Sequence, residues 1–333
     1  MYPQLTKEHI HPTTPKRLAW LLIASLAMFG VANLAVGIFG QHLILEPEST
    51  MIVLKHRILE DLDTPVDVLI VGDSAGNQGV DPATLDPAGI SSVNLCTQGR
   101  MLLVGDLAAM RRYIQKFKTG PKVLLMVHVY DIFRRRQVTY KSILEYRSIQ
   151  AAGIKAKFNF GGLRKQTLVF DHVIPLITKG RAVGDKLRGI PAFEQEHDRG
   201  YFAAKTPHQA NLKTDYLDHC NEIKPGETDW TICEPHWAIL DEILSLARQH
   251  DTHVVLAFSP VYDKLYANPA YQRIIAETKT ALFDTLGHDH FSIVGPMAVP
   301  ANQMGNTVDH VLHPAAQAYT KTLLSHLQPL LAK

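Results

Sequence analysis

Short apolar runs alternate with amphipathic stretches over most of the chain after residue 46. Runs of about four to eight apolar residues between turn-forming residues are typical of buried strands, and apolar residues that recur every three or four positions are typical of helices. Strands that alternate with helices favour a parallel sheet covered by helices on both faces. The sequence therefore predicts a doubly wound α/β domain over residues 46–333. The expected strands are 66–71, 91–95, 122–129, 253–258 and 291–294, and the expected helices are 51–62, 102–117, 237–248, 271–286 and 314–331.

Residues 132–235 interrupt this alternation, and we expect them to form an insertion or cap. Residues 134–205 carry 15 Lys and Arg against 6 Asp and Glu, although the whole chain has a formal net charge of only +2. Such a basic segment can bind an anionic polymer or lipid headgroups, and a solvated basic face explains it equally well. The small net charge of the chain gives no reason to expect a nucleic-acid partner.

An uncharged stretch of 23 residues, Leu18–Gly40, predicts a helix that crosses a membrane. At about 1.5 Å rise per residue it is long enough for a hydrocarbon core of about 30 Å. Lys16 and Arg17 directly precede it. The positive-inside rule therefore places residues 1–17 in the cytoplasm and the α/β domain in the periplasm, with residues 18–40 as a single-pass anchor in the inner membrane and its lipid bilayer. A cleavable signal peptide normally has a shorter apolar region, and a buried core helix normally has a polar face.

The apolar run at residues 66–71 stops abruptly at Gly72-Asp73-Ser74. A buried strand that ends in a sharp turn holds a serine hydroxyl fixed and exposed at the edge of the sheet, where a nucleophile is needed. Ligands of doubly wound sheets bind beyond the carboxyl ends of the strands. Ser74 is therefore a candidate nucleophile. The alternative is a plain strand-to-helix turn in which Ser74 caps the helix.

Three sequence blocks in this region resemble those of the SGNH, or GDSL-like, hydrolase family. Residues 66–82 resemble the first block, whose Gly-Asp-Ser serine attacks an acyl carbonyl. Residues 92–99 resemble the second block, in which Gly99 matches the glycine that gives a backbone N–H to the oxyanion hole. In the place of the third block, Gly-x-Asn-Asp, only Asp131 matches, and Tyr130 replaces the asparagine donor. A tyrosine hydroxyl can also donate, from a longer arm.

Residues 307–320 resemble the last block of the family, which supplies the base. His310 matches the base without a gap. The adjacent Asp309 is the carboxylate that would orient it, because Thr307 stands at the usual position of the acid. The alternative base is His313, which is followed by proline as in many esterases. We prefer His310, and the other histidine would then cap the last helix.

The resemblance implies a flavodoxin-like SGNH fold with a serine–histidine site and no cofactor or metal. The implied residues are Ser74 as nucleophile, His310 as base, Asp309 to orient the base, Ser74, Gly99 and Tyr130 for the oxyanion hole, and Asp73 and Asp131 as supporting residues. An anchor, a Gly-Asp-Ser block, a long insertion and a late histidine also look like the membrane-tethered SGNH-like proteins of bacterial cell envelopes. These include relatives of alginate acetyltransferases and of the proteins that D-alanylate teichoic acids.

This likeness implies a serine O-acyltransferase or esterase acting on O-acyl groups, chiefly acetyl, of an envelope or exported polysaccharide. A membrane-bound O-acyltransferase would be the partner that supplies the acyl group. Transfer and hydrolysis use the same residues and differ in water access and acceptor binding. The alternative is a catalytically degenerate SGNH fold that acts as a scaffold for envelope polymer assembly.

The chain contains three cysteines, which are too few for a disulfide framework. Cys220 and Cys233 are close in sequence, and an oxidising compartment would allow one disulfide bond between them. Unbridged cysteines are the second interpretation. A zinc site made by His219-Cys220 and Cys233-x-x-His236 is the third, because such spacing also arises by chance in a chain with 17 histidines. Cys96 beside an expected strand is predicted to be a small buried residue.

Overall fold

A computed structural model of the chain describes residues 15–43, 49–134, 152–153, 197–204, 232, 234–305 and 307–332. The chain divides into two compact units, residues 1–47 with 165–192 and residues 48–164 with 193–333. Helix α1 (Pro15–Leu43) belongs to the first unit, and every other described helix and strand belongs to the second. Most of the predicted insertion at 132–235 lies outside the described residues.

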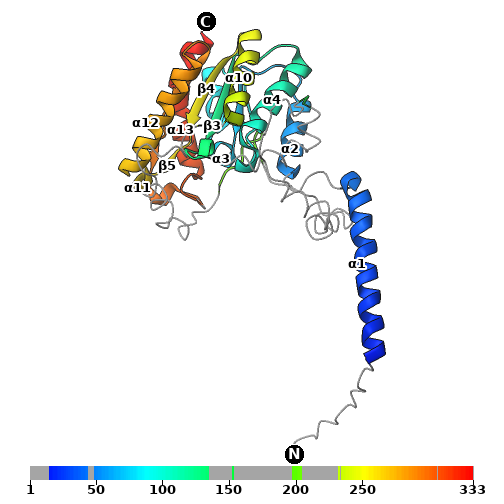
Figure 1. The fold of residues 1–333 in the computed structure, drawn as a ribbon. Helices are drawn as coiled ribbons and strands as arrows, with labels where there is room; N and C mark the ends of the chain where they lie inside the picture. Colours follow the sequence, from blue (N-terminus) through cyan, green and yellow to red (C-terminus); the bar gives the residue numbers. More distant parts are fainter. Residues whose placement is uncertain are drawn as a thin grey trace, which may run out of the picture. The chain divides into compact units, whose positions relative to one another are not determined.

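The second unit is built on a five-stranded sheet in which all strands run parallel (Figure 1). The strands are β1 (Val68–Gly72), β2 (Ser92–Asn94), β3 (Val123–His128), β4 (His253–Phe258) and β6 (Phe291–Val294). Their spatial order is β2-β1-β3-β4-β6, which is the order of flavodoxin-like doubly wound sheets. The predicted α/β class with a parallel sheet is therefore confirmed.

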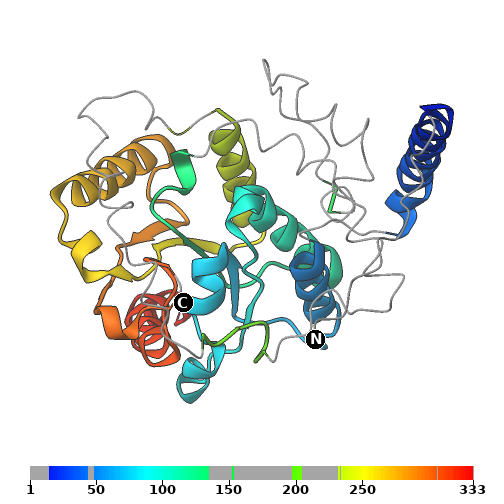
Figure 2. The ribbon, with the colours of Figure 1, turned by 90° about the horizontal axis from the view of Figure 1, so that it is seen from below.

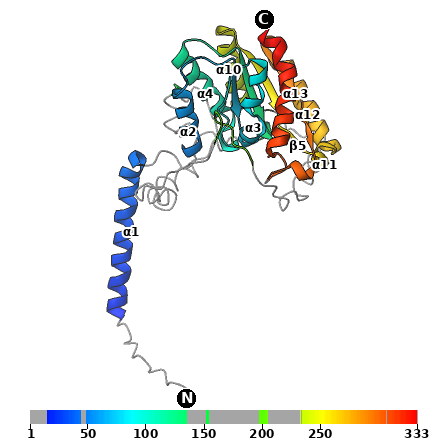
Figure 3. The same cartoon turned by 180° about the vertical axis from the view of Figure 1, so that it is seen from behind.

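Helices cover both faces of the sheet, because alternate strand residues point to opposite sides. On β3, Leu124 and Met126 join one apolar cluster, whereas Leu125 and Val127 join the other. The first cluster also receives residues from α2 (Ser49–Glu60), α4 (Leu102–Phe117), α10 (Glu234–Gln249) and α12 (Pro269–Leu286), which follow one another along one side of the sheet in Figure 2. On the other face, α13 (His313–Leu331) packs beside the short α3 (Ser74–Gly79) (Figure 3). Burial on both sides explains why the strands are almost continuously apolar.

A small second sheet lies beside the main one. It pairs β5 (Val261–Tyr262) with β7 (Ala298–Val299) in parallel, and α11 (Asp263–Tyr266) follows β5 directly. Sequence analysis did not predict these elements, because two-residue strands show no periodicity. It also did not include α3 among the expected helices, because its residues Ser-Ala-Gly-Asn-Gln-Gly lack an apolar repeat; a helix after Ser74 was considered only in the alternative of a strand-to-helix turn.

The described segment 197–204 is fastened to the α/β domain at several points. Arg199 makes a two-pronged ion pair with Asp86, with both N–O distances at 2.8 Å. Ala204 forms a parallel bridge with Leu312, just before α13. The 197–204 segment thus connects the insertion to the loop that leads into the last helix.

A buried lysine provides a further attachment for this segment. Lys55 of α2 is 1% exposed, and its ammonium donates to Asn77 Oδ1 at 2.6 Å and to the Asn94 carbonyl at 3.0 Å. It also donates to the Gly200 carbonyl and lies 5.0 Å from the centre of the Phe202 ring. Burial lowers the pKa of Lys55 to about 7. This side chain joins α2, α3, β2 and the 197–204 segment.

Helix α1 contains a stretch, Pro15–Val36, that is long and apolar enough to cross a membrane. Leu18 and Trp20 are 62% and 71% exposed, and no part of this apolar stretch is buried by the residues that the structure describes. The expected N-terminal apolar helix is therefore present.

Candidate active site

Ser74 stands at the carboxyl end of β1, where the chain turns sharply into α3. The turn requires glycine at position 72, which has a φ of +143° and where an added Cβ would lie 2.0 Å from the Val127 carbonyl oxygen. Asp73 is the N-cap of α3 and accepts a hydrogen bond from the Ala75 N–H at 2.9 Å. The helix cap is therefore Asp73 and not Ser74, which leaves the half-buried Ser74 hydroxyl available for another partner.

That partner is His310, whose Nε2 lies 2.9 Å from Ser74 Oγ. The loop before α13 holds His310 in place, because the Gly305 N–H donates to the His310 carbonyl at 2.6 Å. The next residue, Val311, is fully buried and forms an antiparallel bridge with Met304. A serine and a histidine at this distance have the geometry of a nucleophile and its general base.

His313 has a different partner. It begins α13, and its Nδ1 lies 2.9 Å from the hydroxyl of Tyr201. Tyr201 is 3% exposed and belongs to the 197–204 segment. Of the two candidate bases, the structure brings His310 to Ser74, and it uses His313 to join the start of the last helix to this segment.

Asp309 does not orient the imidazole of His310 as expected. Its carboxylate accepts a hydrogen bond from the hydroxyl of Thr307, and within the described part of the chain it makes no hydrogen bond or ion pair with His310. Side chains of adjacent residues point in different directions, and a hydroxyl two residues away is the easier local partner for a carboxylate. The expected role of Asp309 therefore has no support in this geometry.

The expected oxyanion donors differ in their placement. Gly99 lies in a 3₁₀ turn, Gly99–Met101, that follows β2. The loop before it runs along the nucleophile turn, because the Thr97 N–H donates to the Gly72 carbonyl at 2.8 Å. In the described residues, no hydrogen bond occupies the N–H of Ser74 or Gly99. Backbone N–H groups at the ends of neighbouring strands are suitable donors for an oxyanion.

Tyr130 belongs to the core and not to the expected oxyanion hole. It is 5% exposed, and its ring packs edge-to-face on Tyr271 of α12 at a centroid distance of 5.1 Å. A large ring directly after a buried strand is more stable in the apolar cluster than at an open sheet edge. Tyr130 therefore does not replace the family's asparagine in position.

The two supporting aspartates both lie at the carboxyl edge of the sheet. Asp131 is half-buried in the turn after β3. Asp73 is 2% exposed and accepts a second hydrogen bond, from the Val129 N–H at 3.0 Å. Burial alone would raise the pKa of Asp73, but the neighbouring His128 and the two backbone N–H groups outweigh burial and lower it.

Sequence analysis missed two residues that lie directly behind Asp73. They are His128, the last residue of β3, and Asp106 of α4, which are 0% and 1% exposed. The available signal was Asp106 itself, a carboxylate among the apolar residues Leu103, Val104 and Leu107 on the buried face of an amphipathic helix. A charge in that position needs a buried partner.

The cysteine predictions can be assessed only in part. Cys96 is fully buried, as predicted, and its thiol is free. Cys220 and Cys233, the two cysteines of the expected disulfide, lie outside the described residues. His236, a member of the alternative zinc set, is fully buried, and its Nε2 lies 3.0 Å from the Ile132 carbonyl oxygen. Within the described ranges, no group of three or more His, Cys, Asp or Glu side chains has an arrangement that could hold a metal ion.

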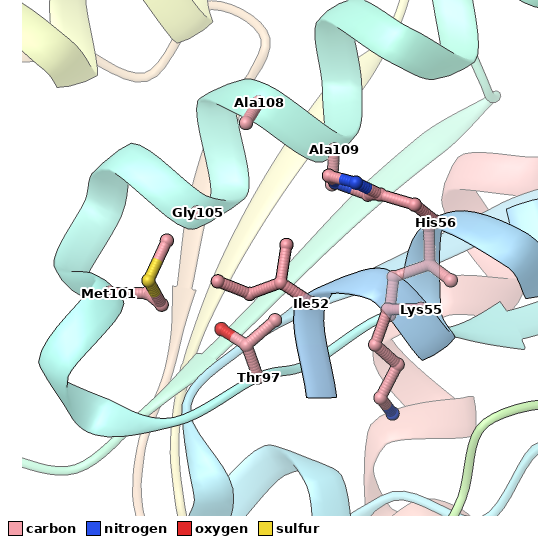
Figure 4. A pocket seen from close by; sticks show the side chains of 9 residues that line it. Ile52, Lys55, His56, Thr97, Met101, Gly105, Ala108 and Ala109 are labelled. Atoms are coloured by element: carbon pink, nitrogen blue, oxygen red, sulfur yellow. The ribbon is translucent and has the colours of Figure 1, made fainter. Parts of the chain in front are cut away.

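A small, mainly apolar pocket lies between α2 and α4 (Figure 4). Ile52, Thr97 and Met101 face one another across it, and the ammonium of Lys55 turns away from it. Neither Ser74 nor His310 lines this pocket, so it is separate from the serine–histidine pair. No protein family model matches the chain, and no curated protein matches it either.

Proposed function

We propose that the chain is a membrane-anchored serine O-acyltransferase or esterase of the SGNH type, acting outside the cytoplasm. Its substrates would be O-acyl groups, in the first place acetyl, of an envelope or exported polysaccharide. The observation that carries this proposal is the distance of 2.9 Å between Ser74 Oγ and His310 Nε2 at the carboxyl edge of a parallel sheet. The apolar helix α1 supports membrane anchoring.

The proposed reaction begins when His310 accepts the proton of Ser74 and the serine oxygen attacks the acyl carbonyl. The N–H groups of Ser74 and Gly99 stabilise the negative charge of the tetrahedral intermediate. His310 then donates the proton to the leaving alcohol, and the acyl group remains on Ser74 as an ester. In the second half, a polysaccharide hydroxyl or water gives its proton to His310 and attacks this ester. The bond between the acyl carbon and Ser74 Oγ then breaks, and His310 returns the proton to Ser74. A positioned base of this kind contributes a factor of about 10²–10⁴ to the rate.

The charge of the insertion supports an anionic acceptor. Residues 134–205 carry 15 basic and 6 acidic side chains, and a segment with this charge would attract an acidic polysaccharide. A membrane-bound O-acyltransferase remains the proposed source of the acyl group.

A catalytically inactive scaffold for envelope polymers is the second candidate. Two observations favour it. Tyr130 is packed in the core instead of supplying an oxyanion donor, and Asp309 is bonded to Thr307 instead of His310. A site that retains only the serine–histidine pair would be slow if catalysis needed both the side-chain oxyanion donor and the orienting carboxylate. Loss of one oxyanion donor alone typically lowers the rate about 10²–10³-fold.

Pre-steady-state kinetics of the full chain in detergent, with p-nitrophenyl acetate, separates the two candidates. The enzyme proposal predicts a burst of p-nitrophenol in the wild type and its loss in Ser74→Ala. Ser325→Ala, which removes an exposed hydroxyl on α13, is the matched control and should keep the burst. An added anionic oligosaccharide should speed turnover, and salt should weaken this effect. Equal activity of the wild type and Ser74→Ala would favour the scaffold.

A further inference from the structure

Three buried titratable groups form a connected chain directly behind the nucleophile turn. Asp106 Oδ2 of α4 lies 2.6 Å from His128 Nε2, and His128 Nδ1 lies 3.5 Å from Asp73 Oδ2, close enough for an ion pair when the ring is protonated but without a hydrogen bond. Asp106, His128 and Asp73 are 1%, 0% and 2% exposed, so none of them meets substrate. Asp73 immediately precedes Ser74 in the chain.

The topology of the sheet creates this arrangement. β1 and β3 are neighbours with Gly72 opposite Val127, so Asp73 and His128 are the next residues along each strand. Because strand side chains alternate, His128 points to the same face as Met126, which is the face that α4 covers. Asp106 on the buried side of α4 meets the ring there.

The two carboxylates favour the charged form of the ring. A neutral imidazole carries one N–H and would present a lone pair to one carboxylate, whereas imidazolium presents an N–H to each. Burial alone lowers the pKa of His128, but Asp106 and Asp73 outweigh it and raise this pKa to about 10. Among the described residues, the titratable groups near these three include Cys96 after β2, His236 of α10 and Tyr319 of α13. Burial raises the pKa of Cys96 and of Tyr319 and lowers that of His236 to about 4, so all three are neutral at pH 7.

Asp73 connects this buried cluster to the turn that carries Ser74. One oxygen accepts from the Ala75 N–H at 2.9 Å and the other from the Val129 N–H at 3.0 Å, so the carboxylate ties the residue after Ser74 to the loop that follows β3. We propose that Asp106 and His128 are positioning residues, which hold Asp73 and through it orient Ser74 towards His310 for acyl transfer. This inference rests on the proposed function.

Asp106→Asn tests the inference because it removes one charge and keeps the side-chain size. Displacing reacting atoms by about 1 Å can cost about 100-fold in rate, so we expect the acylation rate constant to fall about 10- to 100-fold. The apparent KM should change less than about threefold, because buried groups do not touch substrate. An opposite charge at short range shifts a pKa by about one to three units. In a pH–rate profile measured with phenyl acetate, the fall in rate at high pH should therefore occur about one to three pH units lower than in the wild type.

Tyr113→Phe is the matched control. Tyr113 is also buried on α4, and its hydroxyl accepts from the Val66 N–H at 2.8 Å, before the start of β1 and at the opposite end of the strand from Ser74. Tyr113→Phe should lower the stability of the protein. At temperatures below melting, it should change neither the acylation rate constant nor the pH–rate profile. If Asp106→Asn behaves like Tyr113→Phe while activity still depends on Ser74, the inference is overturned and the proposed function stands. If Ser74→Ala is as active as the wild type, both are overturned.

A second measurement tests the charge of His128 in the wild type and does not require that variants of Asp106 or His128 fold. ¹⁵N NMR of histidine-labelled full chain in detergent reports the protonation of each ring. The inference predicts one imidazolium signal that persists from pH 7 to about pH 9 and that is absent from His128→Gln; if that variant does not fold, the persistence of one signal in the wild type suffices. A wild type in which no histidine remains charged at pH 8.5 would overturn the inference, whatever the kinetics show.

Discussion

At the scale of single residues, the site depends on positions where only one residue type fits. Gly72 turns the chain at the end of β1, and any larger residue there meets the backbone of the central strand. Ser74 and His310 are 236 residues apart, and the fold brings them within hydrogen-bonding distance. The carboxylate next to His310 in the chain is not its partner, so proximity in sequence did not predict proximity in space.

Gly72→Ala should lower the free energy of unfolding by about 3 kcal/mol or more, because it combines a φ reserved for glycine with a backbone clash. Gly89→Ala is the control: its φ is +70°, and an added Cβ there meets nothing within 4 Å. The control should lose about 1 kcal/mol, which reflects left-handed backbone strain alone. Chemical denaturation of the full chain in detergent measures both values. A Gly72→Ala variant no less stable than Gly89→Ala would contradict this account of the turn.

His310→Ala and Asp309→Asn should have very different effects. Removing the base should lower the acylation rate constant about 10²- to 10⁴-fold. Asp309→Asn should lower it less than about tenfold, because its carboxylate bonds with Thr307 and not with the imidazole. Burst kinetics with p-nitrophenyl acetate measure both constants. Equal losses in the two variants would show that Asp309 orients the base after all.

At the scale of elements, long apolar runs and amphipathic repeats were predictable. The strands at 253–258 and 291–294 and the helix at 102–117 match the structure at both ends. Elements of two residues, such as β5 and β7, carry no repeat and were missed. The pairing of Asp106 with His128 depends on the packing of α4 against β3, which local patterns do not encode. Ser74 was found from its place at the end of a buried strand, but its pairing with His310 was expected only through a family resemblance, because no local pattern links residues so far apart.

The 197–204 segment should depend on the buried ammonium of Lys55. Lys55→Met leaves the Asn77 side-chain oxygen and the carbonyls of Asn94 and Gly200 without this donor. We expect the free energy of unfolding to fall by about 2–4 kcal/mol. Lys122→Met is the control: its side chain is 63% exposed, and its ion pair with Asp67 should be worth at most about 1 kcal/mol. A similar small loss in both variants would show that Lys55 does not hold these elements together.

At the scale of the whole molecule, the chain combines an apolar helix with an α/β domain that carries the serine–histidine pair. The uncharged segment 18–40 and the two basic residues before it predict that the domain lies outside the cytoplasm. Substrates of such a domain would be extracytoplasmic, in agreement with an envelope or exported polysaccharide as acceptor. The predicted topology and the proposed acyl chemistry are therefore compatible with the same proposed class of substrate.

Reporter fusions after residue 60 test this topology. When fused after residue 60, a reporter that works only in the periplasm should be active, and a reporter that works only in the cytoplasm should be inactive. Replacing Lys16 and Arg17 by glutamate is a useful comparison, because it removes the positive-inside signal and should weaken the orientation. Activity of the cytoplasmic reporter in the unaltered chain would reverse the proposed topology.

The most direct test of the central claim is labelling of the full chain with a fluorophosphonate probe, followed by mass spectrometry of its peptides. The account predicts a single adduct on Ser74, which disappears in Ser74→Ala, forms much more slowly in His310→Ala and is unchanged in Ser325→Ala. The reason is that His310 Nε2 lies 2.9 Å from the serine oxygen and activates this hydroxyl. A folded chain that forms no adduct, or one that is labelled equally well without Ser74, would contradict the account.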